Sequence, residues 1–255
     1  LAPGVLIGKN SWIRGLADSG SIQPFPRSEA PYPLSNDRTR ALVEYEDEFY
    51  GVPLFLALPA LYYNTSIVSN PARSLDDLLQ QAADGDRVEF VPRFEEAYWG
   101  IQAFGDGLFD VNGRFTVAES GFEEWLDWLD KAQRAPGVIL NIDDESLLDL
   151  FASGEIAYYI SGPESLARIT ERMDEENAFE IGVAPLPGGP SGPAGPLTTA
   201  ETIMFYAHSS PEQLRIAGEL AEFLVNERQG IRFMRELEKV PANPRIRVDR
   251  RIYPI

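Results

Sequence analysis

The sequence predicts an α/β protein in which short apolar strands alternate with amphipathic helices. Three stretches carry this prediction. Residues 4–8 (GVLIG) form an apolar run that leads into a helix closing near Gly20, and residues 52–58 (VPLFLAL) form a second run. Residues 156–160 (IAYYI) form a third run, which enters a helix through residues 161–163 (SGP). Small molecules bind at the carboxyl ends of strands in open α/β sheets, so these polar turns are candidate binding positions.

Composition excludes several classes of function. The 255 residues include 22 basic and 40 acidic side chains, a net charge of −18 that argues against nucleic-acid or anionic-membrane partners. The chain has no cysteine, which excludes disulfides, thiolate catalysis and cysteine-ligated zinc. His208 is the one histidine and no G-x-S-x-G motif accompanies it, so a Ser-His-Asp triad is not indicated. We expect no catalytic residue, no metal and no cofactor.

No apolar run reaches the roughly 18–20 residues needed to span a bilayer. No signal-peptide pattern opens the sequence. If the protein is exported, its signal has been removed or lies outside these 255 residues. At this length the chain can hold one large domain or two small ones.

The first elements follow from pattern and turn chemistry. Residues 4–8 are expected to form a buried parallel strand. Asn10 or Ser11 is expected to cap the helix that follows. Residues 44–51 indicate a hairpin, and residues 52–58 a buried strand. Ser74, with an acid three residues later, predicts the capped start of a helix.

The later elements complete the alternation. Residues 88–91 (VEFV) read as a strand, and Asn112-Gly113 predicts a hairpin over residues 109–117. Trp125 lies on the apolar face of a helix and is expected in the core. Residues 143–145 (DDE) could bind calcium, but the EF-hand pattern is absent, so a solvated helix N-terminus is the preferred interpretation.

Five segments resemble one family in the same order along the chain. Residues 151–163 (FASGEIAYYISGP) resemble the pattern F-x-x-G-x-x-A-M-x-I-x-G-P, with Tyr158 in place of the methionine, and residues 50–64 resemble YGVP followed by YN. Three more segments agree with it: residues 70–78, 183–189 and 217–244. The chain thus resembles the extracytoplasmic solute-binding proteins of ABC importers, in the branch that includes maltose-binding protein, apparently shortened at both ends.

The resemblance implies a periplasmic-binding-protein-like fold with two lobes, each a central sheet flanked by helices. The first lobe would comprise residues 1–56 plus 202–240 and be incomplete relative to the family. The second would comprise residues 57–201 plus 241–255. The chain would cross between lobes near residues 55–60, 197–202 and 239–243, leaving a groove where strand ends from both lobes converge.

The resemblance also implies ligand-binding residues. In the first lobe, Asn10, Ser11 and Trp12 follow the first strand, and Trp12 could stack on a ligand or be buried against the core. Thr199 and Glu201 lie on the return hinge. The ligand-binding residues expected in the second lobe are Phe94, Glu95, Tyr98 and Trp99, together with Ser161 and Glu164. Helix core is the alternative for Tyr98 and Trp99. Glu164 stands where the family carries a stacking tryptophan, which favours a hydroxyl-rich or cationic ligand over a large oligosaccharide.

The implied function is non-catalytic binding of a small polar solute, a sugar, for delivery to the membrane subunits of an ABC transporter. The implied location is periplasmic or cell-surface, tethered to the membrane. One alternative is a solute-binding-like domain of a transporter membrane subunit or sensor that acts through protein–protein contact. A carboxylate-dependent hydrolase is the third and weakest class. The adjacent Glu95 and Glu96 would point about 100° apart on a helix and could not flank one glycosidic bond.

Overall fold

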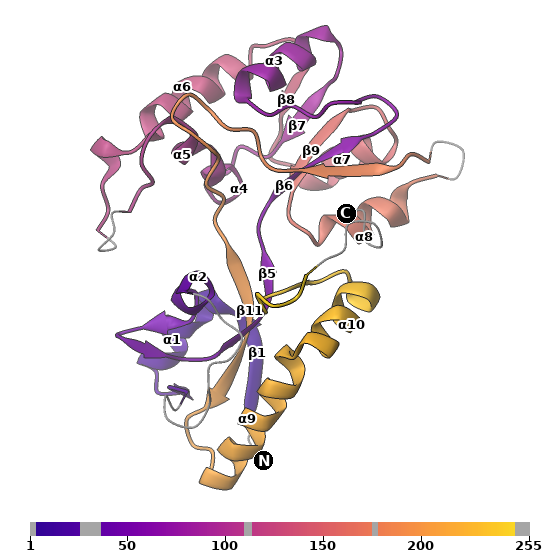
Figure 1. Cartoon of the computed structure of the whole chain (residues 1–255). Coiled ribbons are helices and arrows are strands. Elements are labelled where there is room, and N and C mark those ends of the chain that lie inside the picture. Colours follow the sequence, from indigo (N-terminus) through magenta and orange to yellow (C-terminus); the bar gives the residue numbers. More distant parts are fainter. Residues whose placement is uncertain (1–3, 26–36, 110–113, 175–177, 248–255) are drawn as a thin grey trace. The chain divides into compact units, whose positions relative to one another are not determined.

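The computed structural model describes residues 4–25, 37–109, 114–174 and 178–247. Contacts divide the chain into two compact units. Unit 1 consists of Leu1–Ala57 and Thr198–Pro254, and unit 2 of Leu58–Leu197. The chain therefore enters unit 2 after Ala57 and returns to unit 1 after Leu197, as the colours of Figure 1 show. In the described ranges, every helix is too short or too polar to cross a lipid bilayer.

The described part of unit 1 is built on a five-stranded antiparallel sheet. Its strands are β1 (Val5–Lys9), β2 (Ile22–Gln23), β5 (Val52–Ala57), β11 (Thr199–Tyr206) and β12 (Val240–Pro241). The order is β1-β11-β5-β12, and β2 pairs with the end of β11. The prediction of a parallel strand at residues 4–8 is wrong, because β1 lies at the edge of the sheet and runs antiparallel to β11.

Helices cover both faces of the unit 1 sheet. They are the short 3-10 helix η1 (Asn10–Trp12), α1 (Ile13–Asp18), α2 (Asp37–Ala41), α9 (Pro211–Val225) and α10 (Glu227–Leu237). Ala217 and Ala221 of α9 pack with Phe205 of β11, while Ile13 of α1 packs with Met204 on the opposite face. The predicted hairpin is confirmed as β3 (Glu44–Tyr45) and β4 (Glu48–Phe49).

The segment after residue 240 belongs to unit 1 as far as the structure describes it. The sequence assigns residues 241–255 to the second lobe. In the structure Pro241 pairs with Phe55 of β5, and Asn243 donates from Nδ2 to the Val225 carbonyl at 2.9 Å. These contacts hold residues 241–247 beside β5 and α9, and residues 248–255 lie outside the described ranges.

Unit 2 has a mixed five-stranded sheet in its described residues. In spatial order its strands are β10 (Ile181–Ala184), β6 (Ala60–Asn64), β9 (Tyr158–Ser161), β7 (Val88–Phe90) and β8 (Val138–Leu140). β9, β7 and β8 are parallel, whereas β6 runs antiparallel to β9 and β10. Since β7 and β9 are parallel neighbours, their carboxyl ends lie at the same edge of the sheet.

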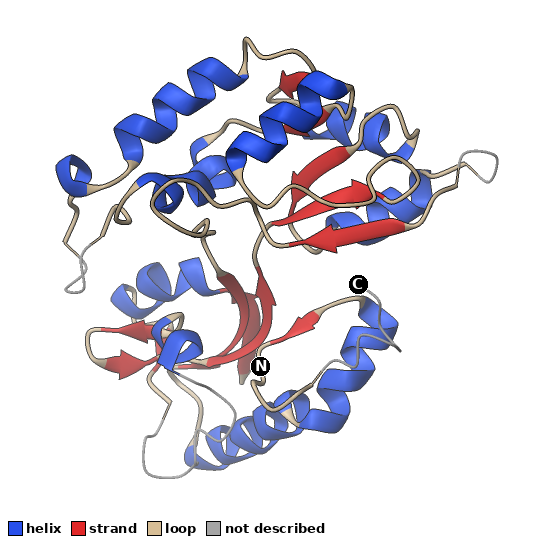
Figure 2. Ribbon diagram, turned by 45° about the horizontal axis from the view of Figure 1, so that its top comes forward, coloured by secondary structure: helices blue, strands red, loops and turns tan. Residues whose placement is uncertain are grey.

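Both faces of the unit 2 sheet are buried beneath helices (Figure 1 and Figure 2). The helices are α3 (Leu75–Asp84), α4 (Phe94–Ala97), the 3-10 helix η2 (Tyr98–Gly100), α5 (Ile101–Phe104), the 3-10 helix η3 (Val117–Glu119), α6 (Phe122–Ala132), α7 (Asp144–Ala152) and α8 (Ser165–Arg172). Val88 and Phe90 point toward α3 and α6, where Trp125 is buried as predicted. Tyr159 and Val91 point toward α7 and α8.

Local turn chemistry in unit 2 agrees with the sequence. The Ser74 hydroxyl accepts from the Asp77 amide, and the Asp77 carboxylate accepts from the Ser74 amide, which completes the capping box of α3. Gly154 adopts a φ of +79° after α7, a conformation that glycine tolerates best. The predicted hairpin over residues 109–117 lies partly outside the described ranges, although Phe109 and Phe115 form an antiparallel bridge.

Candidate functional site

The turn after β9 places polar groups at the carboxyl edge of the unit 2 sheet. Ser161 ends the strand, and its Oγ lies 2.7 Å from Oγ of the buried Ser165. Tyr62 of β6 donates to the Gly162 carbonyl at 3.0 Å. Glu164 is exposed at the N-cap of α8, and its carboxylate folds over Gly162. The predicted pair Ser161 and Glu164 is thus brought together on one turn.

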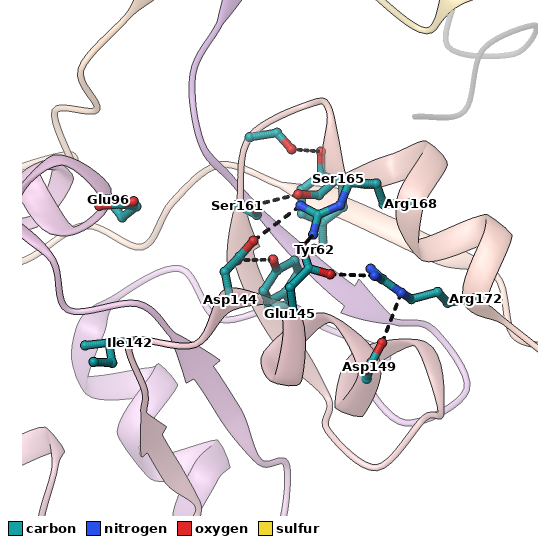
Figure 3. Close-up of polar contacts among 12 residues, drawn as sticks. Tyr62, Glu96, Ile142, Asp144, Glu145, Asp149, Ser161, Ser165, Arg168 and Arg172 are labelled. Atoms are coloured by element: carbon teal, nitrogen blue, oxygen red, sulfur yellow. Dashed lines mark hydrogen bonds and ion pairs between the residues drawn. The ribbon is translucent and has the colours of Figure 1, made fainter.

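A polar network ties this turn to α7 and α8 (Figure 3). Tyr159 is fully buried, and its hydroxyl donates to Oδ1 of Asp144 at 2.6 Å. Arg168 donates from Nη1 to Oδ2 of the same carboxylate at 3.3 Å. Burial raises the pKa of the Tyr159 hydroxyl above its usual value, and the hydrogen bond to Asp144 raises it further by a smaller amount. The hydroxyl therefore stays protonated and remains a donor to Asp144.

The network continues along the outer faces of α7 and α8. Arg168 and Arg172 both bind Glu145, and Nε of Arg172 lies 3.0 Å from Oδ1 of Asp149. These groups are partly exposed, so each ion pair contributes about 0–1 kcal/mol, whereas their common effect is to fix the two helices together. The acids at residues 144–145 are paired with arginines, not simply solvated as the sequence suggested.

The turn after β7 lies at the same edge and presents an exposed aromatic ring. Phe94 begins α4 with 57% of its surface exposed, and Tyr98 packs edge-on against it with centroids 5.8 Å apart. Glu95 is exposed. Arg93 binds Glu96 at 2.8 Å and donates to the Ile142 carbonyl at 3.1 Å, which fixes the start of the helix. The edge therefore combines an aromatic face with carboxylates.

Trp99 is a core residue. It is 1% exposed and packs against Trp125 with centroids 4.9 Å apart, on the face of the sheet covered by α6. The segment from Phe94 to Phe104 is broken here into the short helices α4, η2 and α5. This break turns Trp99 inward while Phe94 stays exposed. The core alternative holds for Trp99, and we do not retain it among the candidate binding residues.

In unit 1, Asn10 has a structural role. Its Nδ2 donates to the Leu42 carbonyl at 3.2 Å, and its Oδ1 accepts from the Ala200 amide at 3.0 Å. The amide group thus connects η1 to β11 and to the segment before β3. Neither Asn10 nor Ser11 caps a helix through its side chain, so the predicted N-cap is wrong. The N-cap of η1 is Lys9, and that of α1 is Trp12.

The other candidates of unit 1 lie near β1 and β11. Ser11 is exposed, and Trp12 is 49% exposed with its ring against Gly8, where a Cβ would lie 2.4 Å from the indole. Thr199 is exposed at the start of β11. Glu201 is half-buried and accepts from Nζ of Lys239 at 2.9 Å. Trp12 therefore offers an aromatic surface in unit 1, as Phe94 does in unit 2.

Sequence reasoning missed the partners that hold the unit 2 edge. Arg168 and Arg172 are spaced by four residues on α8 and so lie on one face, which is the signal that could have paired them with the acids at 144–149. Tyr159 gave no such signal, because its neighbours on β9 are equally apolar. Its partner Asp144 comes from α7, which packs beside β9 only in the folded structure.

The fold and the site together define a class: an α/β protein with a polar, aromatic strand-end edge of the kind that binds small molecules. Residues 2–248 match the family described as "Bacterial extracellular solute-binding protein". The chain belongs to this family.

Known proteins agree with that assignment. Maltodextrin-binding protein MdxE of Bacillus subtilis is 23% identical over an alignment of 263 residues. The alignment covers 95% of this chain and 61% of MdxE. The fold matches that of a cyclo/maltodextrin-binding protein complexed with maltotetraose, with a TM-score of 0.83, 20% identity and coverage of 99% of this chain and 67% of the other. It also matches UgpB of Mycobacterium tuberculosis in complex with glycerophosphocholine, with a TM-score of 0.77, 20% identity and coverage of 95% and 67%.

Two consequences follow from these comparisons. The chain spans about half the length of the curated relatives that it matches. The related proteins are binding proteins rather than enzymes, and the family description indicates an extracytoplasmic location.

Proposed function

We propose that the chain binds a small carbohydrate without chemical change and presents it to the membrane subunits of an ABC transporter. The observation that carries the proposal is the unit 2 edge, where the exposed ring of Phe94 lies on the turn neighbouring Ser161 and Glu164. A sugar packs its C–H groups against an aromatic face, and its hydroxyls bind carboxylates and hydroxyls nearby. The names of the relatives, which refer to maltodextrin and maltotriose, support the same solute class.

We propose contacts with the solute for each unit by itself. Those of unit 2 are Phe94, Glu95, Tyr98, Ser161 and Glu164. Those of unit 1 are Ser11, Trp12, Thr199 and Glu201. We propose that the protein acts at the cell surface or in the periplasm, tethered to the membrane, as expected from the sequence.

A thermal-shift panel tests the proposal. Maltose, maltotriose and maltotetraose are titrated, with glycerophosphocholine included because UgpB binds it in the same fold. A solute at 100 times its Kd should stabilise the protein by about 2.7 kcal/mol. Binding of glycerophosphocholine alone would assign a different solute class, and the absence of any shift across the panel would contradict the proposal.

Calorimetry on single variants tests the site. Phe94→Ala should weaken carbohydrate binding about tenfold, or ~1.4 kcal/mol, through loss of the aromatic surface. Phe115→Ala is the matched control, because Phe115 is 63% exposed in the same unit and is not among the proposed contacts. Equal Kd values for the two variants would remove Phe94 from the site.

One observation favours protein–protein contact as a second function. Helix α9 of unit 1 exposes Ile216, Leu220 and Phe223. A domain that acts through such a surface would show no thermal shift with any solute in the panel. Its association with a transporter subunit would be abolished by the substitution Leu220→Glu.

A further inference from the structure

Glu89 is a carboxylic acid inside the apolar layer between the unit 2 sheet and α7. It lies in the middle of β7, between Val88 and Phe90, which point toward α3 and α6. Because successive side chains of a strand alternate, Glu89 points to the other face, the side of α7. Its lateral neighbours are Tyr159 on β9 and Ile139 on β8.

The surroundings of Glu89 are almost entirely apolar. α7 packs against both β7 and β9. The side chains that α7 buries are Leu147, Leu148, Phe151 and Ala152. Glu89 itself is 0% exposed, and neither of its carboxyl oxygens has a hydrogen-bond partner among the described residues. A carboxylate in such a place is strongly unfavourable, whereas the neutral acid is tolerated far better.

The charged groups around Glu89 do not compensate for its burial. Burial raises the pKa of Glu89 from 4.5 to about 7. The charge of Arg87, just before β7, lowers this pKa, and that of Glu155, in the turn after α7, raises it. On β9, the Tyr159 hydroxyl is directed to Asp144 at the start of α7. Arg168 on α8 is paired with Asp144 and Glu145. Ile139 on β8 carries no charge.

We propose that Glu89 makes unit 2 a proton-linked element: one proton on this side chain lets α7 close on the sheet, and its loss as the pH rises loosens α7. The consequence reaches the candidate site, because the Tyr159–Asp144 bond joins α7 to β9 just before Ser161. Alkaline conditions therefore loosen the turn at residues 161–164. This inference concerns the stability of unit 2 and does not depend on the proposed solute.

The sign follows from proton linkage. The folded protein holds the Glu89 proton up to about pH 7, whereas the unfolded chain releases it near pH 4.5. Between these values the folded state binds more protons, so the contribution of Glu89 to stability is fully present below pH 4.5 and falls as the pH rises toward 7. Above pH 7 the contribution of Glu89 to the stability of unit 2 is lost in full. The unfolding equilibrium constant is then larger by a factor on the order of 100.

Urea denaturation between pH 4.5 and 8.5 tests the proposal. Trp99, Trp125 and Trp128 all lie in the core of unit 2, so their fluorescence follows that unit, and Trp12→Phe in every variant removes the unit 1 tryptophan. The parent should lose stability with rising pH relative to Glu89→Gln and Glu89→Met, which cannot ionise. Parallel pH profiles for parent and variants would overturn the proposal.

Two measurements keep the test decisive if the Glu89 variants fail to fold. Side-chain carboxyl ¹³C NMR on the parent should show one glutamate titrating near neutrality, and a full set titrating near 4.5 would refute the inference. Glu155→Gln, at an exposed position, should move that titration to lower pH by removing a neighbouring negative charge. Hydrogen exchange in α7 and in residues 161–164 should accelerate above pH 7 beyond the intrinsic base-catalysed increase, while α3 should not.

Discussion

Helices cover both faces of the sheet in each unit, but the largest fully buried side chains lie mostly in unit 2, whereas α9 of unit 1 leaves apolar side chains exposed. Unit 2 encloses Trp99, Trp125 and Phe151 at 2% exposure or less. In unit 1, by contrast, Phe223 of α9 is 53% exposed and Ile7 of β1 is 49% exposed. Both units thus follow the same α/β pattern, but they differ in where their largest apolar side chains lie.

The exposed flank of α9 can be placed by helix geometry. Gly218 of α9 faces Phe25, which follows β2. In the sheet, Phe205 of β11 pairs with β2 on one side and with β1 on the other. Ile216, Leu220 and Phe223 are about half a turn from Gly218. They therefore lie on the flank of α9 that faces away from Phe25. The comparison teaches that the same α/β pattern can bury its large side chains in one unit and leave a helix flank exposed in the other.

The largest effect is expected in the tryptophan core of unit 2. Trp125→Ala should destabilise unit 2 by about 3–5 kcal/mol, because a buried indole stacked on Trp128 at 5.0 Å leaves a cavity. The control is Phe223→Ala on α9, for which about 0.5 kcal/mol or less is expected. Equal losses in urea denaturation would contradict the difference in burial between the units.

A pair of tyrosine–aspartate bonds gives the next effect. Tyr159→Phe removes a buried hydrogen bond to Asp144 and should destabilise unit 2 by about 1.5–3 kcal/mol. Tyr45→Phe in unit 1 removes a bond of similar length, 2.7 Å, to the exposed Asp18. It should have a clearly smaller effect in thermal denaturation. If the two variants lose equal stability, burial does not control these bonds.

Helix caps should behave alike in the two units. Ser74 caps α3 in unit 2 and Ser210 caps α9 in unit 1, each through a capping box. Ser74→Ala and Ser210→Ala should each destabilise their unit by about 1 kcal/mol, since the cap is a local interaction. Circular dichroism melts measure both. A much larger loss for Ser210→Ala would show that α9 is held mainly by its cap.

The smallest stability effect is expected on the exposed flank of α9. Leu220→Glu should change the free energy of unfolding by less than about 0.5 kcal/mol, because Leu220 is 44% exposed. It should also reduce binding of the apolar dye ANS, for which Leu126→Glu on α6, 48% exposed in unit 2, is the control. A large loss of stability would mean that the flank is covered in solution.

The sequence predicted what local chemistry determines. The cap at Ser74 and the hairpin after residue 43 depend on a few adjacent residues, and both are confirmed. The two-unit α/β fold was reached through family resemblance, and known structures support it. The orientation of β1 could not be predicted from its apolar run, because orientation depends on the partner strand.

The candidate site shows the same division. The sequence left Trp99 open between helix core and ligand contact, and the break of the helix at residues 98–100 turns its ring inward while Phe94 stays exposed. Glu89 alternates with Val88 and Phe90 as a solvent-facing residue would, yet α7 covers that face as well. Tertiary packing determines the orientation of Trp99 and the burial of Glu89, and it cannot be predicted from the residues adjacent to them.

The stacked indoles of α6 have an optical consequence. The rings of Trp125 and Trp128 are inclined by only 10° with centroids 5.0 Å apart. Electronic transitions of two chromophores this close and this nearly parallel couple with each other. The near-ultraviolet circular dichroism of the protein should therefore be dominated by this pair, which would give unit 2 a spectrum of its own.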